Sequence, residues 1–262
     1  MLFSRKVVRA TTKKLGKKSS SKYNKVSIII PVYNERDTFE KLLKRVLKVK
    51  LPIEREIIII EGNSTDGTRK IVKKYEGKKD IKIYYINKYC GKGYKVRFGI
   101  KKSTGDIILI QDADLEYDPM EYPQLLAPLL KGKTKFVLGS RHLGKKTWKI
   151  REFDHSKWYG HFVSVGSEAT NWYFLLLYGV KLTDPQTMYK IFTRDCLNTV
   201  TLKSNEFDLD WEIVIKLCKT GFKPIEVPVS YKARTFEQGK KIRIVRDGFR
   251  ALWAITKYRF IN

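Results

Sequence analysis

The sequence predicts an α/β fold with a mostly parallel central sheet that is covered by helices on both faces. Short apolar runs rich in Ile and Val do not alternate with polar residues, which is typical of strands buried on both faces. Segments with helical periodicity separate these runs, so consecutive parallel strands can be joined by helices. The 262 residues, 42% of them hydrophobic, are enough to fill the core of such a domain.

Predicted strands and helices alternate along the first half of the chain. We expect strands at 26–33, 55–61, 81–86, 105–112 and 135–140. We expect helices at 35–49, 66–75, 93–103 and 122–130. In the first of these helices one face is apolar, as packing on a sheet requires, and it consists of Phe39, Leu42, Leu43, Val46 and Leu47.

The second half of the chain is less regular. We expect an aromatic-rich helix through 172–178, a turn at 182–192, a helix around 210–221, a strand at 223–234 and a basic helix at 242–260. Residues 1–25 contain nine basic residues and no acid, which predicts a basic tail outside the folded domain. The domain itself is expected to span residues 26–262, without internal repeats.

Composition limits the function and the compartment. The chain has 54 Lys and Arg residues against 27 Asp and Glu residues, and this excess favours a polyanionic partner such as nucleic acid, an anionic membrane or a phosphorylated substrate. Solvated basic faces are the alternative. The longest apolar run, 172–180, is about half of the roughly 20 residues that a membrane-spanning helix needs. The three cysteines form no CxxC pair, which predicts reduced thiols in a cytosol-facing compartment.

The residues that end the strands are the candidates for a binding site, because ligands of parallel α/β sheets bind at the carboxyl ends of the strands. These ends are "PVYNE" at 31–35, "EGNSTDGT" at 61–68, "DADLE" at 112–116 and "GSR" at 139–141. We expect all four to lie on one rim of the sheet.

Four acids crowd the third of these ends, at Asp112, Asp114, Glu116 and Asp118. An EF-hand would need Gly where Tyr117 stands, so that calcium loop is excluded. A solvated turn is the general alternative. Like charges this close are unfavourable unless a cation lies between them, and Mg²⁺ or Mn²⁺ takes oxygen ligands while leaving positions for phosphate. The position at a strand end therefore favours a metal site that binds a diphosphate.

Seven segments in order, "VSIIIPVYNE", "EGNSTDGT", "GKG", "DADLE", "GSR", "LTDPQTMYKIF" and "EVPVSYKAR…GKKIRIVRDGFRALW", resemble a family 2 glycosyltransferase of the GT-A fold. Within this family the chain is most similar to dolichyl-phosphate and polyprenyl-phosphate hexosyltransferases. The resemblance implies a metal-dependent, inverting transfer of mannose or glucose from GDP-mannose or UDP-glucose to a polyprenyl or dolichyl phosphate. It also implies a cytoplasmic protein that is peripheral on the cytosolic membrane face, with a nucleotide-sugar-binding half at 26–144 and an acceptor half at 145–262.

The resemblance assigns roles to single residues. The nucleotide sugar would be bound by Pro31, Tyr33, Glu35, Glu61, Asp112, Ala113 and Asp114. The metal, Mg²⁺ or Mn²⁺, would be held by Asp112, Asp114 and Glu116. Phosphate of the acceptor or donor would be bound by Arg141, Arg234 and Lys241, and the residues with catalytic roles would be Asp114, Arg141, Arg234 and Asp184. Two departures are Glu61-Gly62, where relatives usually have two Asp residues, and Glu116, where some have Gln.

The nature of the acceptor decides whether a general base is needed. A lipid phosphate is already ionised near neutral pH, whereas a hydroxyl acceptor would need a base, for which Asp184 and Glu212 are candidates. Each also has a structural reading, because Asp-Pro is common in turns and Glu212 lies in a predicted helix. The glycine-rich "GKG" at 91–93 is not a Walker loop and predicts a helix start near the diphosphate.

Two alternatives remain open at this point. The same fold could act on a glycan, protein or small-molecule hydroxyl. A basic nucleic-acid-binding module is an alternative of another class, but it would have no use for acids at the strand ends, so we expect no nucleic-acid partner. The aromatic stretches at 171–179 and 249–260 are either core helices or, with their flanking Lys and Arg, a surface at a lipid headgroup layer.

Overall fold

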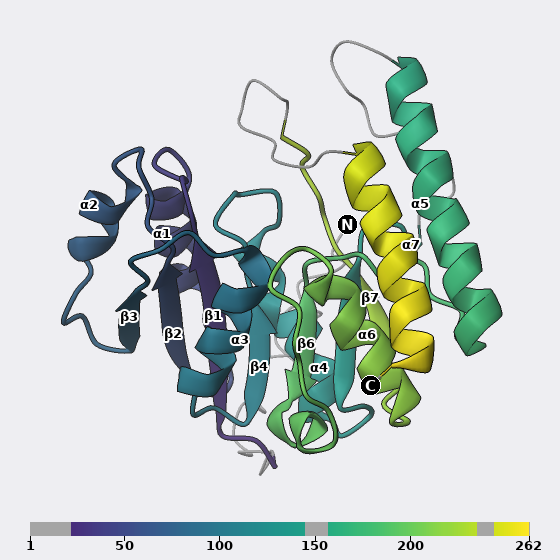
Figure 1. Cartoon of the computed structure of the whole chain (residues 1–262). Helices are drawn as coiled ribbons and strands as arrows, with labels where there is room; N and C mark the ends of the chain where they lie inside the picture. Colours follow the sequence, from purple (N-terminus) through teal and green to yellow (C-terminus); the bar gives the residue numbers. More distant parts are fainter. Residues whose placement is uncertain (1–21, 145–156, 235–243, 262) are drawn as a thin grey trace, which may run out of the picture.

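A seven-stranded sheet forms the centre of the part of the chain that the structure describes (Figure 1). The structure is a computed structural model and describes residues 22–144, 157–234 and 244–261. The strand order is β3-β2-β1-β4-β6-β5-β7. The strands are β1 (Lys25–Val32), β2 (Glu54–Glu61), β3 (Ile81–Tyr85), β4 (Ile107–Ile110), β5 (Phe136–Ser140), β6 (Lys190–Thr193) and β7 (Ile225–Pro228).

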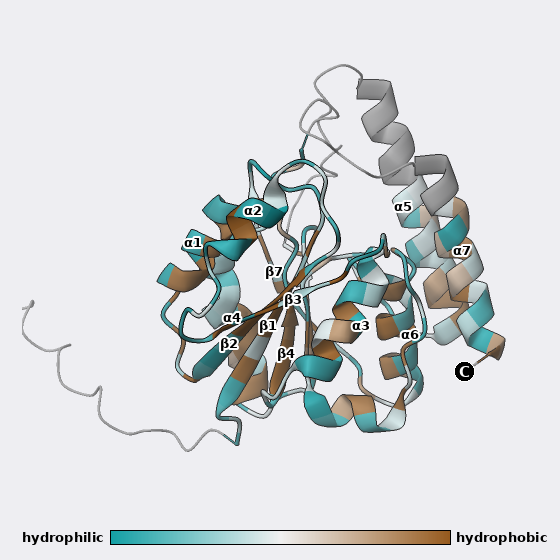
Figure 2. Cartoon of the chain, turned by 60° about the vertical axis from the view of Figure 1, so that its left-hand side comes forward, coloured by the Kyte–Doolittle hydropathy of each residue, from teal (hydrophilic) through white to brown (hydrophobic). Residues whose placement is uncertain are grey.

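Helices cover both faces of this sheet (Figure 2). One face carries α1 (Phe39–Lys48), α2 (Thr68–Lys73) and α4 (Tyr122–Leu130), and the other carries α3 (Lys92–Lys102) and α6 (Leu209–Lys219). Two further helices, α5 (Lys157–Tyr178) and α7 (Ile244–Phe260), pack against each other and against α6. Two short 3₁₀ helices, Pro119–Glu121 and Arg194–Thr199, come directly before α4 and directly after β6. The predicted α/β fold with a mostly parallel sheet is confirmed.

The sheet departs from the prediction at β6, whose first three residues lie in the segment 182–192 that we expected to be a turn. This strand pairs antiparallel with both β4 and β5. Its four residues are too few to give a periodic signal, and its polar ends Lys190 and Thr193 hide the fact that all four are buried. As a result, the acids after β4 and the arginine after β5 come from strands that are not neighbours.

The core follows from the apolar strands, which form the hydrophobic centre of the molecule in Figure 2. The Ile residues in the middle of β1 and β2 are fully buried, and burial of each contributes about 1.5–3 kcal/mol. Gly99 lets α3 lie directly on these strands, because a Cβ there would come within 2.6 Å of the Ile29 side chain and 2.7 Å of the Ile60 side chain. The core thus holds α3, and the residues at its start, in a fixed position above β1 and β2.

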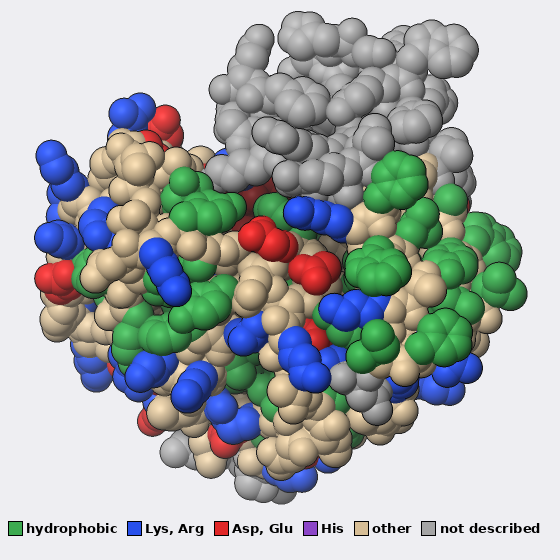
Figure 3. All heavy atoms as spheres, viewed as in Figure 1, with side chains coloured by type: hydrophobic (Ala, Val, Ile, Leu, Met, Phe, Trp, Pro, Cys, Tyr) green, Lys and Arg blue, Asp and Glu red, His purple; other side chains and the backbone are tan. Residues whose placement is uncertain are grey.

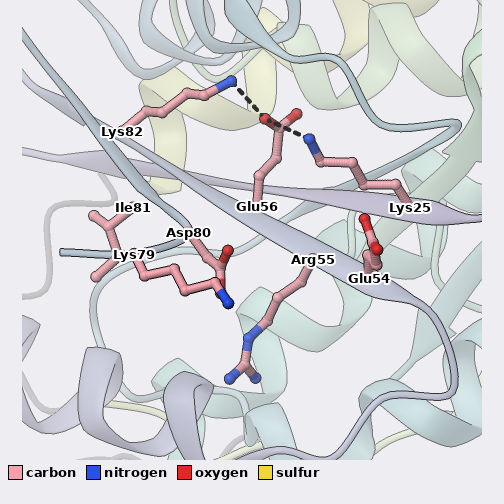
Figure 4. A pocket seen from close by; sticks show the side chains of 8 residues that line it. All are labelled: Lys25, Glu54, Arg55, Glu56, Lys79, Asp80, Ile81 and Lys82. Atoms are coloured by element: carbon pink, nitrogen blue, oxygen red, sulfur yellow. Dashed lines mark hydrogen bonds and ion pairs between the residues drawn. The ribbon is translucent and has the colours of Figure 1, made fainter.

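The opposite, amino-terminal edge of the sheet contains a hollow of about 510 Å³ (Figure 4). Glu56 is buried beside it and accepts hydrogen bonds from Ser27 Oγ at 2.6 Å, Thr104 N at 2.5 Å and Lys82 Nζ at 2.8 Å. A second lysine, Lys25, lies with its Nζ 3.3 Å from the same carboxylate. Both lysines point toward Glu56 in Figure 4, so the buried carboxylate in this hollow already has two cationic partners.

Candidate active site

The carboxyl ends of β1, β2, β4 and β5 share one edge of the sheet. β1 is parallel to β2 and β4, with Val32 opposite Glu61 and Ile29 opposite Ile110. β5 has the same direction as β4, because β6 runs antiparallel to both. The expectation that the four strand ends lie on one rim is confirmed.

Arg234, which follows β7, lies among three of the acids on this rim. Its Nη1 is 3.0 Å from Glu35 Oε2, and its Nη2 is 3.2 Å from Asp114 Oδ2. Its Nε is 3.8 Å from Glu116 Oε1, and this buried Nε has no hydrogen-bond partner among the residues that the structure describes. The structure therefore brings Arg234 to the predicted metal ligands, from which it is separated by about 120 residues in sequence.

The positive charge of Arg234 does not offset the effect of burial and neighbouring acids on the pKa of Asp114. Burial and the charges of Asp112 and Glu116 raise the pKa of Asp114 to about 7, although Arg234 works in the opposite direction. Burial also raises the pKa of Asp112. An added cation would stabilise the ionised form of these carboxylates and lower their pKa.

The donor set suits a hard divalent cation, because Asp112, Asp114 and Glu116 offer only oxygen atoms. Within the described residues, however, no three His, Cys, Asp or Glu side chains converge as a ready-made metal site. Two of these carboxylates are already paired with cations. Asp114 lies 3.2 Å from Arg234 Nη2, and Asp112 lies 2.9 Å from Lys92 Nζ. Each of these ion pairs uses one oxygen of its carboxylate, so the acids would offer their other oxygens to a metal while Lys92 stays beside Asp112.

Tyr231 connects the two arginines of the rim. Its hydroxyl donates to Glu116 Oε2 at 2.9 Å, while the backbone N–H of Arg234 donates to Glu116 Oε1 at 3.0 Å. The guanidinium of Arg141 lies over the Tyr231 ring, 5.1 Å from the ring centroid. Arg141 thus contacts Tyr231 directly, and Arg234 is connected to the same tyrosine through Glu116. The binding of one phosphate by both arginines stays a prediction. Lys241, the third predicted phosphate ligand, lies outside the described residues.

Asp184 holds Arg141 in place. Its carboxylate accepts from Arg141 Nε and Nη2, both at 2.7 Å, and from the Arg141 backbone N–H at 2.9 Å. Burial would raise the pKa of Asp184, but Arg141 outweighs burial and lowers it. A carboxylate with these three donors is suited to orienting an arginine and poorly suited to accepting a proton.

Glu212, the other candidate base, is fully buried in α6. It accepts from the backbone N–H groups of Lys203 and Ser204, at 2.8 Å each, and pairs with Lys216 at 2.7 Å. Its hydrogen bonds therefore hold the segment before α6. Sequence reasoning overlooked Asp210, two residues earlier on the same helix, whose Oδ2 is 3.5 Å from Lys92 Nζ.

The "GKG" motif forms the start of α3, as expected. A Cβ on Gly91 would come within 2.1 Å of the Asn205 carbonyl oxygen, and one on Gly93 within 2.7 Å of the Glu206 carbonyl oxygen. The two glycines therefore allow α3 to begin in close contact with the segment that leads to α6. Lys92 lies between them and carries its ammonium group to the rim.

Aromatic and acidic side chains line the ends of β1 and β2, where the nucleotide is expected. Tyr33 makes an edge contact with Tyr89 at 5.4 Å between centroids, and Lys95 lies 5.1 Å from the Tyr33 centroid. Glu61 is fully buried and is paired with Arg69. At the next residue, Gly62, a Cβ would come within 2.9 Å of the Lys95 side chain.

Two predicted nucleotide-binding residues are covered by other parts of the protein. Pro31 lies within β1, opposite Ile60 of β2, and Ala113 is only 3% exposed. Both residues are buried, so neither offers an accessible side chain to a ligand. Tyr33 and Asp112 are partly exposed, so their side chains are accessible to a ligand in this region.

Comparison with known proteins places the chain in a family. The family described as glycosyl transferase family 2 matches residues 27–215. A dolichol-phosphate mannosyltransferase from Pyrococcus furiosus is 27% identical over 89% of this chain and 64% of its own length. The glycosyltransferase AglJ from Haloferax volcanii is 25% identical over 85% of this chain and 68% of its own length.

A third relative, an undecaprenyl-phosphate 4-deoxy-4-formamido-L-arabinose transferase from Proteus mirabilis, is 33% identical over 48% of this chain and 39% of its own length. The chain thus spans about two thirds or less of the length of these curated relatives.

Solved structures share the fold. A glucosyl-3-phosphoglycerate synthase from Mycobacterium tuberculosis superposes with a TM-score of 0.68 and 16% identity, covering 94% of this chain and 84% of the other. The same synthase in complex with Mn²⁺, uridine diphosphate and phosphoglyceric acid gives a TM-score of 0.66 with 15% identity, covering 91% and 80%. The match over residues 27–215 shows that the chain belongs to glycosyl transferase family 2.

Proposed function

We propose that the protein is an inverting glycosyltransferase that moves a hexose from a nucleoside-diphosphate sugar to a polyprenyl or dolichyl phosphate. The observation that carries this proposal is the rim cluster, in which Glu35, Asp114 and Glu116 surround Arg234, and Arg141 lies across Tyr231. A site with acids for a metal and arginines for phosphate suits two phosphorylated substrates. The names of two relatives, dolichol-phosphate and undecaprenyl-phosphate transferases, support a lipid-phosphate acceptor.

In the proposed reaction an oxygen of the acceptor phosphate attacks the anomeric carbon of the sugar. The new carbon–oxygen bond forms on the face opposite the departing group, and the old bond breaks with its electron pair going to the nucleoside diphosphate. No proton has to be removed, because the acceptor oxygen is already ionised. This is consistent with a site in which Asp184, a candidate base, is bound by an arginine.

The residues of the rim divide the work between the two phosphates. Asp112, Asp114 and Glu116 would hold Mg²⁺ or Mn²⁺, which when bound supplies positive charge to the departing diphosphate. Arg141 is fixed by Asp184 and provides a planar pair of donors for phosphate. Arg234 is paired with Glu35 and Asp114 in this structure. It would contact a phosphate of the donor or of the acceptor after these ion pairs break.

We also propose that α5 and α7 rest on an anionic membrane surface. Large apolar side chains point outward from both helices, with Trp172 and Trp253 about two thirds exposed (65% and 67%) and Phe249 71% exposed. Figure 3 shows hydrophobic side chains gathered over these two helices. Exposed Arg250 and Arg259 lie on α7 beside them. No helix among the described residues is long and apolar enough to span a membrane.

The acceptor assay tests the main proposal. Purified protein would receive radiolabelled GDP-mannose or UDP-glucose with Mn²⁺ and either polyprenyl phosphate or the matching polyprenol. We expect transfer to the lipid phosphate and none to the alcohol. Equal or better transfer to the alcohol would overturn the phosphate-acceptor proposal and favour a hydroxyl acceptor.

Vesicle binding tests the membrane surface. We expect the double change Phe249→Ser and Trp253→Ser to weaken binding to anionic vesicles, because it removes exposed apolar area from the surface. Met120→Ser, which removes a 57% exposed side chain outside α5 and α7, is the matched control. Added salt should weaken binding of the unchanged protein, since each basic residue near the surface contributes about 1 kcal/mol. Equal loss in both variants would contradict this surface.

A further inference from the structure

Four charged side chains form a continuous chain that begins on the rim and ends inside the protein. Asp112 Oδ2 lies 2.9 Å from Lys92 Nζ, which is 3.5 Å from Asp210 Oδ2. On the far side of this carboxylate, Asp210 Oδ1 is 3.2 Å from Lys190 Nζ. The charges alternate, so the chain has no net charge. Only its Asp112 end belongs to the predicted donor site.

The exposed fraction is highest at the Asp112 end of this chain of charges and zero at the Lys190 end. The side chain of Asp112 is 23% exposed, those of Lys92 and Asp210 are 13% and 16% exposed, and that of Lys190 is completely buried. Each member comes from a different element: the end of β4, the start of α3, the start of α6 and the start of β6. Burying four charges is unfavourable unless each is paired, so apolar side chains would hold these elements together at least as well. The arrangement therefore suggests a role at its exposed end.

The role follows from the charge of the donor. A nucleoside diphosphate that lies beside Asp112 would be repelled by this carboxylate unless cations are close to both, and the proposed metal and a basic side chain would each supply part of that positive charge. Lys92 is the cation that touches Asp112, and Gly91 and Gly93 place it there by letting α3 start against the segment 204–206. Asp210 draws the same ammonium group from the other side, and Lys190 balances the charge of Asp210.

We propose that Lys92 binds the diphosphate of the donor and that Asp210 is a positioning residue, which holds the Lys92 ammonium group beside Asp112. This assignment rests on the proposed function, because it needs a diphosphate ligand at the rim. It gives the "GKG" motif a second purpose beyond close packing, and it makes Asp210 and Lys190 part of the donor site although neither is expected to touch the donor.

The test compares a nucleoside diphosphate with the nucleoside that lacks both phosphates. Affinity would be measured with Mg²⁺ by calorimetry for GDP or UDP, whichever the unchanged protein binds, and by ligand-observed NMR for guanosine or uridine. We expect Lys92→Met and Asp210→Asn each to weaken diphosphate binding by about tenfold or more, as for loss of a charged hydrogen bond. Nucleoside binding should not change, and Lys92→Arg should keep most of the diphosphate affinity.

Glu56→Gln is the matched control, because Glu56 is also a buried carboxylate paired with a lysine but lies at the other edge of the sheet. It should leave diphosphate binding unchanged. Equal losses for diphosphate and nucleoside in Asp210→Asn, or the same loss in Glu56→Gln, would show a purely structural role and overturn the assignment. If Asp210→Asn does not fold, Lys92→Met provides the same comparison. Failure of the unchanged protein to bind any nucleoside diphosphate would overturn the proposed function itself, and this assignment with it.

Discussion

The two edges of the sheet both contain buried carboxylates, but the protein treats them in opposite ways. At the amino-terminal edge, burial alone would raise the pKa of Glu56, yet hydrogen bonds from Lys82, Ser27 and Thr104 outweigh it and lower this pKa. At the carboxyl-terminal edge, burial and neighbouring acids raise the pKa of Asp114 to about 7. The first carboxylate is satisfied by the protein, and the second is not.

This difference separates a structural acid from a candidate functional one. Glu56 joins β2 to the segment before β4 through Thr104 and Gly105, so its charge stabilises the fold. Asp114 is paired with Arg234 at 3.2 Å, while Asp112 and Glu116 add to its negative surroundings. A strongly shifted carboxylate in such a position is a candidate for binding or catalysis. The following predictions test whether the two edges differ in this way.

The largest effect is expected for Asp114→Asn. We expect transfer to fall by about 100-fold or more, as for loss of a group that stabilises charge in the transition state, while the fold is retained. Asp118→Asn is the matched control, because Asp118 belongs to the same acid cluster but its carboxylate caps the 3₁₀ helix by accepting from Met120 N at 3.1 Å. Asn also caps helices, so this variant should stay active. Similar losses in both variants would remove the special role of Asp114.

Glu56→Gln should have the opposite profile. We expect the free energy of unfolding to fall by about 2–4 kcal/mol, because a buried ion pair is broken and several hydrogen bonds are weakened. Nucleotide affinity of the folded protein should not change, since Glu56 lies at the other edge of the sheet. Urea denaturation and calorimetric titration of the same samples provide the two measurements. Unchanged stability would show that the contacts of Glu56 with Thr104 and Gly105 do not stabilise the fold.

Arg234 provides a third test, because it is the cation that the acid cluster already has. Arg234→Lys should lower transfer to polyprenyl phosphate by about tenfold, equivalent to about 1.4 kcal/mol, because lysine lacks the planar pair of donors. Arg234→Met should also strengthen binding of Mn²⁺ to the donor-free protein, measured by electron paramagnetic resonance, since it removes a competing positive charge.

Lys232→Met is the control for this change, because Lys232 is exposed and lies two residues earlier. It should alter neither transfer nor Mn²⁺ binding. Weaker Mn²⁺ binding in Arg234→Met would contradict the view that the arginine and the metal compete for the same carboxylates.

Much of the rim can be predicted from sequence, because Ile- and Val-rich runs show where parallel strands end. These strand ends suffice to place Glu35, Asp112, Asp114 and Arg141 on one edge of the sheet. The contacts of Arg234 cannot be predicted in this way, since its backbone follows a short strand and meets the acids from about 120 residues away. Periodicity carries no information about such long-range contacts.

The same limit applies to two further residues, whose contacts cannot be read from the sequence. Asp184 looks like a turn residue or a base until its contacts with Arg141 are seen. Asp210 has no signal beyond its place at a helix start, and its connection to Lys92 spans 118 residues. A signal for Lys92 did exist, in the unusual glycines on either side of it, but its meaning depends on the carbonyl groups of 204–206.

The smallest expected effect is the most direct comparison of the two edges, and it uses pH. Without metal, the folded-state pKa of Asp114 is above its unfolded value, so the folded protein binds the extra proton between about pH 4 and 7. Stability of the unchanged protein relative to Asp114→Asn should therefore fall as the pH rises through this window, by about 1 kcal/mol or more, and stay constant above it. Glu56 has the opposite sign: its lowered pKa contributes stability above the unfolded value, near pH 4.3, and this contribution is lost as the pH falls further. Thermal unfolding of both variants and the unchanged protein, in chelator and at several pH values, measures the two differences. Curves with the same direction for both carboxylates would show that the two edges of the sheet do not differ as described.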